Sequence, residues 1–138
     1  MVRATLVMLS AIVLFQAAAS RDAAVQAPAK PVDFGPDDPV AKDRQHYSVE
    51  IENEHVRVVR VKYAAREPGL LHEHRCGRVT VYLTPTHQSL KRPNGDVTES
   101  RAKAGETRWS TPDRHEDLNL DDTPIELVFV DVKSACGK

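Results

Sequence analysis

Two separate segments carry the side chains in this sequence that are best suited to metal chemistry. His72 and His74 flank Glu73, and His115 follows later in the chain. On an extended strand, successive side chains alternate between two faces, so His72 and His74 point the same way and Glu73 points away. A histidine arriving from a later strand completes a set of three nitrogen ligands, which suits zinc, iron, nickel or copper. The sequence therefore predicts a divalent transition-metal site at His72, His74 and His115.

The elements that must position these histidines read as strands. Between Tyr47 and Lys133 the chain consists of short runs in which apolar residues alternate with polar ones, and no run has a sustained helical period. Asn94-Gly95 separates two such runs, which is a strong hairpin signal. At Val58-Val59 the apolar alternation slips by one residue, which predicts a β-bulge. Short strands recurring roughly every ten residues favour a small antiparallel barrel or sandwich.

The order of these motifs resembles the cupin superfamily, in particular a small secreted single-domain cupin of bacterial type. In that family a first motif supplies two histidines, and a second opens with glycine, passes a proline-containing turn and supplies a third histidine and an asparagine. The matching positions here are His72, His74, Gly105, His115 and Asn119. The resemblance covers about residues 47–133 and implies an all-β fold, a small antiparallel cupin-like barrel of the jelly-roll type.

The sequence departs from the family pattern at the usual fourth ligand, a glutamate that follows the second histidine after three or four intervening residues. Those positions hold Arg78 and Val79. Without the carboxylate, magnesium and calcium are disfavoured, because these ions prefer oxygen ligands. A guanidinium near the histidines would oppose a bound cation, or it would bind an anionic ligand with its planar fork. A metal site and a degenerate site with hydrogen-bonded histidines therefore both stay open.

Three functions remain open on these residues. The first is a metal-dependent enzyme of unknown reaction, for which the sequence assigns no catalytic residue. The second is a non-catalytic module that binds a small anionic molecule through Arg78, Tyr82 and Trp109, although single aromatics in a small barrel are more often part of the core. The third is an interaction protein, since cupin barrels commonly pair with themselves, which implies a homodimer.

The N-terminal region has the composition of an export signal. A positive start at Met1-Val2-Arg3, an apolar run from Ala4 to Phe15 and the small residues Ala17-Ala18-Ala19 predict a signal peptide over residues 1–19. The apolar run is shorter than the roughly 20 residues that span a bilayer, so we expect a secreted or periplasmic protein without stable membrane insertion after cleavage. An uncleaved anchor is the alternative.

The segments that flank the barrel have little apolar surface. Residues 20–46 are rich in proline, alanine and aspartate and read as a leader or linker, with an edge strand around residues 32–34 as the alternative. Residues 134–138 read as a C-terminal tail. Three further histidines lie outside the motifs and are expected at the surface: His46, His55 and His87.

Cys76 and Cys136 both fall in the exported portion. An oxidising compartment permits a disulfide between them, while two free thiols, an intermolecular bridge, or Cys76 as a soft metal ligand remain alternatives. The formal net charge of the chain is −1, and it has no basic run. This balance gives no electrostatic basis for binding nucleic acid.

Overall fold

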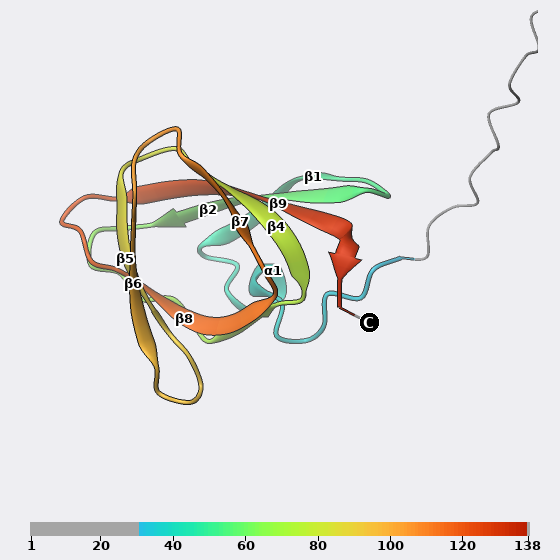
Figure 1. The fold of residues 1–138 in the computed structure, drawn as a ribbon, viewed down its shortest axis with the longest axis horizontal. Coiled ribbons are helices and arrows are strands. Elements are labelled where there is room, and N and C mark those ends of the chain that lie inside the picture. Colours follow the sequence, from blue (N-terminus) through green and yellow to red (C-terminus); the bar gives the residue numbers. More distant parts are fainter. Residues whose placement is uncertain (1–30, 138) are drawn as a thin grey trace, which may run out of the picture.

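Two antiparallel sheets curve around a common interior in the computed structural model, which describes residues 31–137 (Figure 1). The first sheet has the strand order β1-β2-β9-β4-β7 and the second has the order β3-β8-β5-β6. The described elements are α1 (Pro39–Lys42), β1 (Tyr47–Glu52), β2 (Val56–Tyr63), β3 (His72–His74), β4 (Cys76–Tyr82), β5 (Thr86–Lys91), β6 (Val97–Ala102), β7 (Thr107–Ser110), β8 (Asp113–Asn119) and β9 (Ile125–Cys136). The predicted all-β antiparallel barrel is confirmed.

The interior of the barrel is divided into an apolar part and a polar part. Alternation along β2, β4 and β9 turns every second side chain inward, because strand side chains alternate between faces. The apolar part contains Tyr47, Val59, Val61, Tyr63, Tyr82, Ile125, Leu127 and Phe129. The polar part contains the three histidines of the motifs together with buried arginine, aspartate, glutamine and threonine side chains. Burying polar side chains costs free energy of folding unless they are hydrogen-bonded or paired with an opposite charge.

The two turn and bulge predictions have different outcomes. Asn94 and Gly95 lie in the turn between β5 and β6, and Gly95 has a φ of 91°, which a residue without a Cβ adopts readily. The register irregularity lies in β1, between Val49 and Ile51, where Val49 pairs with Val59 and Ile51 with Val58. The bulge predicted at residues 58–59 is therefore at the correct place in the sheet, but the extra residue lies on β1, the partner strand, rather than on β2.

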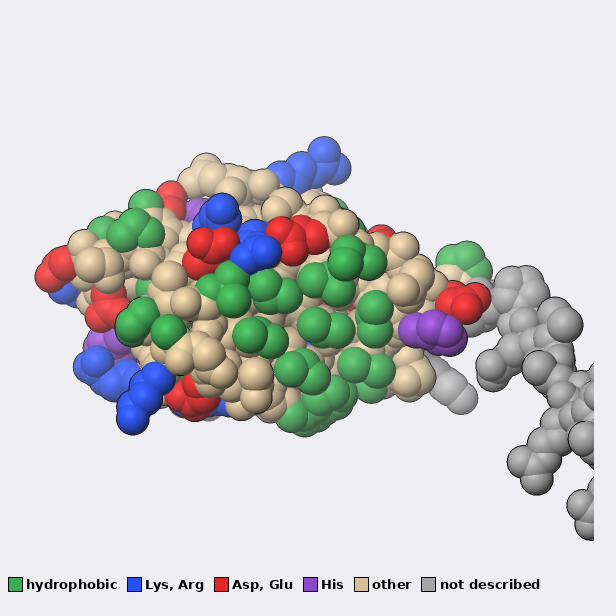
Figure 2. Space-filling model, turned by 90° about the horizontal axis from the view of Figure 1, so that it is seen from above, with side chains coloured by type: hydrophobic (Ala, Val, Ile, Leu, Met, Phe, Trp, Pro, Cys, Tyr) green, Lys and Arg blue, Asp and Glu red, His purple; other side chains and the backbone are tan. Residues whose placement is uncertain are grey.

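An apolar row crosses the outer face of the five-stranded sheet. The row consists of residues that are cross-strand partners of one another on neighbouring strands, in the order Ile51, Val58, Val130, Val79 and Trp109. Ile51 and Trp109, at the two edges, are each 56% exposed. Figure 2 shows hydrophobic side chains gathered over this face, with charged side chains mainly at its margins. We call this surface the outer apolar face.

Residues 37–46 pack onto the barrel, which corrects the interpretation of residues 20–46 as a leader or linker. Asp38, Asp43 and His46 are all buried. Asp38 accepts two hydrogen bonds from Arg57 of β2, and Arg57 also binds Asp131 of β9. The segment is held by this buried ion pair together with Pro39, which is fully buried, and Val40, which packs against the core. No edge strand forms at residues 32–34.

The C-terminal boundary also differs from the prediction. β9 continues to Cys136, so residues 134–136 are part of the sheet rather than a tail. Cys76 at the start of β4 and Cys136 at the end of β9 are bonded in a disulfide. This pairing excludes Cys76 as a metal ligand in this structure.

Several predictions concern residues that the structure does not describe. The signal peptide over residues 1–19, residues 20–30 of the predicted leader and Lys138 lie outside the described residues. Within residues 31–137, no helix has the length and apolar character needed to cross a membrane.

Candidate metal centre

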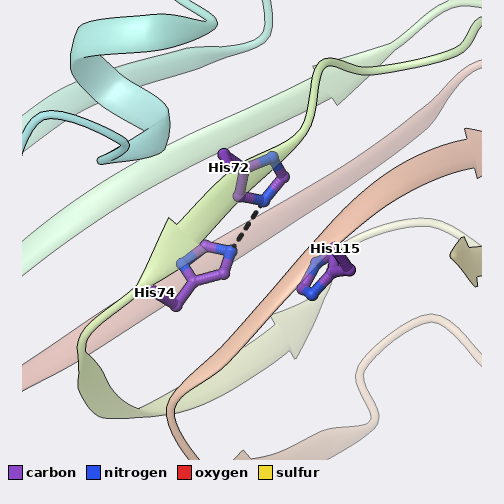
Figure 3. A group of neighbouring side chains, drawn as sticks. All are labelled: His72, His74 and His115. Atoms are coloured by element: carbon purple, nitrogen blue, oxygen red, sulfur yellow. Dashed lines mark hydrogen bonds between the residues drawn. The ribbon is translucent and has the colours of Figure 1, made fainter. Parts of the chain in front are cut away.

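Strands β3 and β8 bring the three predicted ligands together. The strands pair antiparallel with His72 opposite His115 and His74 opposite Asp113. Because His72 and His74 are two residues apart on β3, both side chains enter the interior, and Glu73 turns away to pair with Arg75. All three rings are buried, and Figure 3 shows the two β3 rings beside the ring from β8.

The ring nitrogens of the three histidines converge. One candidate ligand atom from each ring lies within 4.8 Å of those from the others, and Nε2 of His72 is 3.0 Å from Nε2 of His74. Two nitrogens that lie about 2.1 Å from one ion at a right angle are about 3.0 Å apart, so this separation fits two ligands of one metal. Nδ1 of His72 donates to the carbonyl of Leu70 at 2.8 Å, so Nε2 of this ring is the acceptor nitrogen, and it is hydrogen-bonded to Nε2 of His74.

His115 contributes a buried nitrogen that has no hydrogen bond. Its Nδ1 lies 3.3 Å from the Asp113 carboxylate, but the angle is unsuitable for hydrogen bonding and the atom is left without a partner. Buried polar atoms are nearly always satisfied, so an exception calls for an explanation. Nε2 of the same ring, on the side of Asp117 and His72, is a different atom, so the fit of the cluster to a metal ion rests on the spacing of its nitrogens.

The protein environment keeps the β3 rings neutral. Burial lowers the pKa of His72, and burial together with the positive charge of Arg78 lowers the pKa of His74 well below its usual value. Neutral imidazole is the form that coordinates metals. The rings are therefore prepared for coordination without a proton to displace at neutral pH.

Asp117 is a buried carboxylate that the sequence prediction missed. It lies two residues after His115 on β8, so strand parity places it on the same inner face. Its Oδ1 is 3.6 Å from Nε2 of His115, and its Oδ2 is 3.6 Å from Nε2 of His72. The same parity rule that selected the histidines would have identified this residue.

The Asp117 carboxylate is held in its charged form. Tyr47 and Tyr63 direct their hydroxyls to its Oδ2 at 3.0 and 3.3 Å. Burial opposes the charge, but hydrogen bonding and charge from His115, with His72 and Tyr47, lower the pKa of Asp117 below its usual value. The site thus contains an oxygen donor on β8, although the family position on β4 has none.

Arg78 lies inside the barrel, close to the histidines. Its side chain is 5% exposed, and its guanidinium carbon is 5.0 Å from the ring centroid of Phe129. The ring of His74 packs edge-on against the same phenylalanine, with centroids 5.4 Å apart. The position that usually supplies a carboxylate therefore places a cation beside the histidine cluster.

The two aromatic candidates for ligand binding behave differently. Tyr82 is buried in the apolar core and also lines an interior cavity of about 310 Å³ that reaches His115. Trp109 contributes to the wall of this cavity, but its position opposite Val79 and its exposure turn the indole to the outer apolar face. A Cβ at Gly77 would collide with the indole, so the tryptophan covers that glycine from outside.

The remaining histidines are only partly as expected. His55 is exposed, and the partly exposed His87 pairs with Glu99 at 2.8 Å. His46 is buried, which contradicts the surface prediction. Its ring stacks on Tyr63 with centroids 4.1 Å apart, and Nδ1 bonds Asp43 at 2.7 Å. This histidine supports the tyrosines that hold Asp117.

The residues that correspond to the second family motif have structural roles. Asn119 is buried and donates to the carbonyls of Ala64 and Thr123 at 2.8 and 2.9 Å. It thereby fixes two loops at the end of β8. The Glu106 carboxylate accepts the backbone N–H of Lys103 before β7.

Comparison with solved structures identifies the fold. A cupin domain from Bordetella pertussis Tohama I superposes with a TM-score of 0.58 at 26% identity, over 63% of this chain and 91% of that chain. A double-stranded β-helix protein from Klebsiella pneumoniae subsp. pneumoniae MGH 78578 has a TM-score of 0.52 at 25% identity, over 66% and 78% of the two chains. The barrel has the cupin fold. Neither a protein-family model nor a curated protein matches this sequence.

Proposed function

We propose that this protein is an exported cupin that binds one divalent transition metal through His72, His74 and His115. The convergence of three buried imidazoles is the observation that carries the proposal. Asp117 is the carboxylate beside this cluster: its Oδ1 is free of the two tyrosine hydroxyls and lies 3.6 Å from Nε2 of His115. Such a donor set suits zinc, iron, nickel or copper.

The metal supplies Lewis acidity, and the residues around it determine what can approach. His115 and Asp117 line the interior cavity, so a small molecule in that cavity lies against the proposed ligands. Hydrogen bonds from Tyr47 and Tyr63 hold the Asp117 carboxylate in place. A metal-dependent reaction on a small molecule is the function that this arrangement supports best.

Metal analysis of the untagged full chain, purified without chelator, tests the proposal. We expect about one transition metal per chain, and His74→Ala and His115→Ala each reduce metal content sharply. Asp117→Asn lowers affinity while the fold is kept. His87→Ala is the matched control, because this histidine lies outside the cluster and pairs with Glu99. Substoichiometric metal that none of the cluster substitutions changes would refute the proposal.

A non-catalytic binding module with a degenerate metal site is the second candidate, favoured by Arg78 in place of the usual carboxylate ligand. The two candidates differ in the response to Arg78→Gln. Binding of an anion requires the guanidinium, whereas metal content should be kept or increased when the positive charge is removed. Measuring both quantities on this one variant separates the candidates.

Export is supported by the order of the N-terminal segments and by the Cys76–Cys136 disulfide, a bond that persists in oxidising compartments. We expect secreted or periplasmic protein to begin after about Ala19. Intact-mass measurement of exported material tests this, and a mass that includes Met1 would contradict it.

A further inference from the structure

Two buried arginines in the barrel differ in how their donors are satisfied. Arg57 binds Asp38 with two nitrogens and Asp131 with its Nε, so all three donor groups have carboxylate partners. A buried guanidinium is stable only when paired in this way. Arg57 is therefore a structural residue, and it is the reference for a buried arginine whose hydrogen-bond donors all have carboxylate partners.

Arg78 is buried to the same extent without such partners. Its Nε has no hydrogen bond, and its Nη1 reaches only the carbonyl of Thr111 at 3.5 Å. No ion pair within 4 Å joins Arg78 to any carboxylate of residues 31–137. Leaving a buried charge uncompensated costs several kcal/mol in proteins. The unpaired fork indicates that an anionic partner is missing from the interior.

The interior cavity is the place where that partner fits. It has a volume of about 310 Å³ and is lined by Arg78, by His115 and Asp117, and by the apolar side chains of Leu127 and Phe129. Its volume lies at the lower end of the range typical for small-molecule sites.

The other two arginines at the cavity are already engaged. Arg92 binds the Asp113 carboxylate at 3.2 Å, and Arg108 binds Glu106 at 2.8 Å. Arg78 is therefore the arginine of the cavity wall whose fork remains available. One available guanidinium accommodates one carboxylate, and the charge of Asp117 disfavours a second.

We infer that the cavity binds a small monocarboxylate, whose carboxylate pairs with the fork of Arg78 and whose apolar body lies against Phe129 and Leu127. This deepens the proposed function by naming its substrate class, and it rests on that function only for the adjacent metal. The carboxylate supplies the counter-charge that Arg78 lacks. It also separates the guanidinium from the cation at the histidines, because an anion between two positive groups attracts both.

Calorimetric titration of the full chain with acetate, butyrate and benzoate tests the inference, with each matched amide as the neutral control. Zinc-loaded and chelator-treated protein are both titrated. We expect at least one acid to bind at least tenfold more tightly than its amide. Arg78→Gln should abolish this preference, and Arg78→Lys should weaken binding about tenfold because a lysine lacks the bidentate fork. Arg44→Gln, which removes one exposed positive charge, should change nothing.

The outcomes for the carboxylate site and for the metal are distinguishable. An acid preference that Arg78→Gln leaves intact would overturn the inference, as would equal binding of all acids and amides by the wild type. This comparison within the wild type remains decisive even if Arg78→Gln does not fold. Arg78-dependent binding in a protein that holds no metal would support the inference while the metal proposal fails.

Discussion

Asp38→Ala is expected to destabilise the barrel because Arg57 depends on this carboxylate. Asp38 accepts hydrogen bonds of 2.7 and 2.9 Å from the two terminal nitrogens of Arg57, while Nε of Arg57 binds Asp131 at 2.9 Å. Arg57 is 5% exposed, so water cannot replace the lost partner. Removing one member of a buried ion pair costs about 3–5 kcal/mol, and because Asp131 remains, we expect the lower end, about 3 kcal/mol.

Thermal and urea unfolding followed by circular dichroism measure this loss. At about 4 °C per kcal/mol for a domain of this size, Tm should fall by about 12 °C. Asp122→Ala is the matched control, because its carboxylate is 84% exposed and pairs with Arg66 at the surface. We expect no measurable change in that variant. Equal Tm values for the two variants would refute the conclusion that residues 37–46 belong to the folded domain.

Four further predictions concern stability and the metal. Deleting residues 1–31 should leave cooperative urea unfolding intact, whereas deleting residues 1–46 should abolish it, because only the longer deletion removes Asp38. The chelator-treated protein should lose stability as the pH falls below 6.5, because the pKa of His72 and His74 is depressed in the native state and the unfolded chain therefore binds protons that the native chain does not. Urea unfolding at pH 7.5 and 5.0 measures this, and an equal free energy of unfolding at the two pH values would contradict it. Replacing Cys76 and Cys136 by alanine should cost about 4 kcal/mol in urea unfolding, given the sequence separation of 60, and no loss would mean that the crosslink is dispensable. Arg78→Glu should raise the affinity for zinc, because it replaces a cation near His74 with a carboxylate. Competition with a chelating dye measures this affinity, and a weaker affinity would show that the side chain does not reach the site.

Local pattern was sufficient to predict the histidine cluster and the hairpin. Strand parity aligns His72 with His74, and Asn94-Gly95 specifies a turn whatever surrounds it. The convergence with His115 needed the order of the motifs as well, because the pairing of β3 with β8 joins distant parts of the chain. The fold and the clustering of the three histidines could therefore be predicted from the sequence.

Contacts between distant charged and polar groups were not accessible in this way. Strand parity places Asp117 on the same inner face as His115, but its hydrogen bonds with Tyr47 and Tyr63 join strands far apart in the sequence. The segment around Asp38 packs through a buried ion pair, whereas its apolar content resembles that of a linker. From the sequence, Trp109 is expected in the core or in a cavity wall. The alternation of a single strand does not reveal that the outer face of the sheet, where the indole lies, is also apolar.

The position of β9 has a consequence for the order in which the molecule can be made. This strand, residues 125–136, follows the other eight in the chain, yet it lies between β2 and β4 at the centre of its sheet. Until the ribosome has released it, β2 and β4 have no common partner and the barrel cannot close. Closure of the barrel must therefore wait until the whole of β9 has been synthesised, and until then β2 and β4 each present an unpaired strand edge.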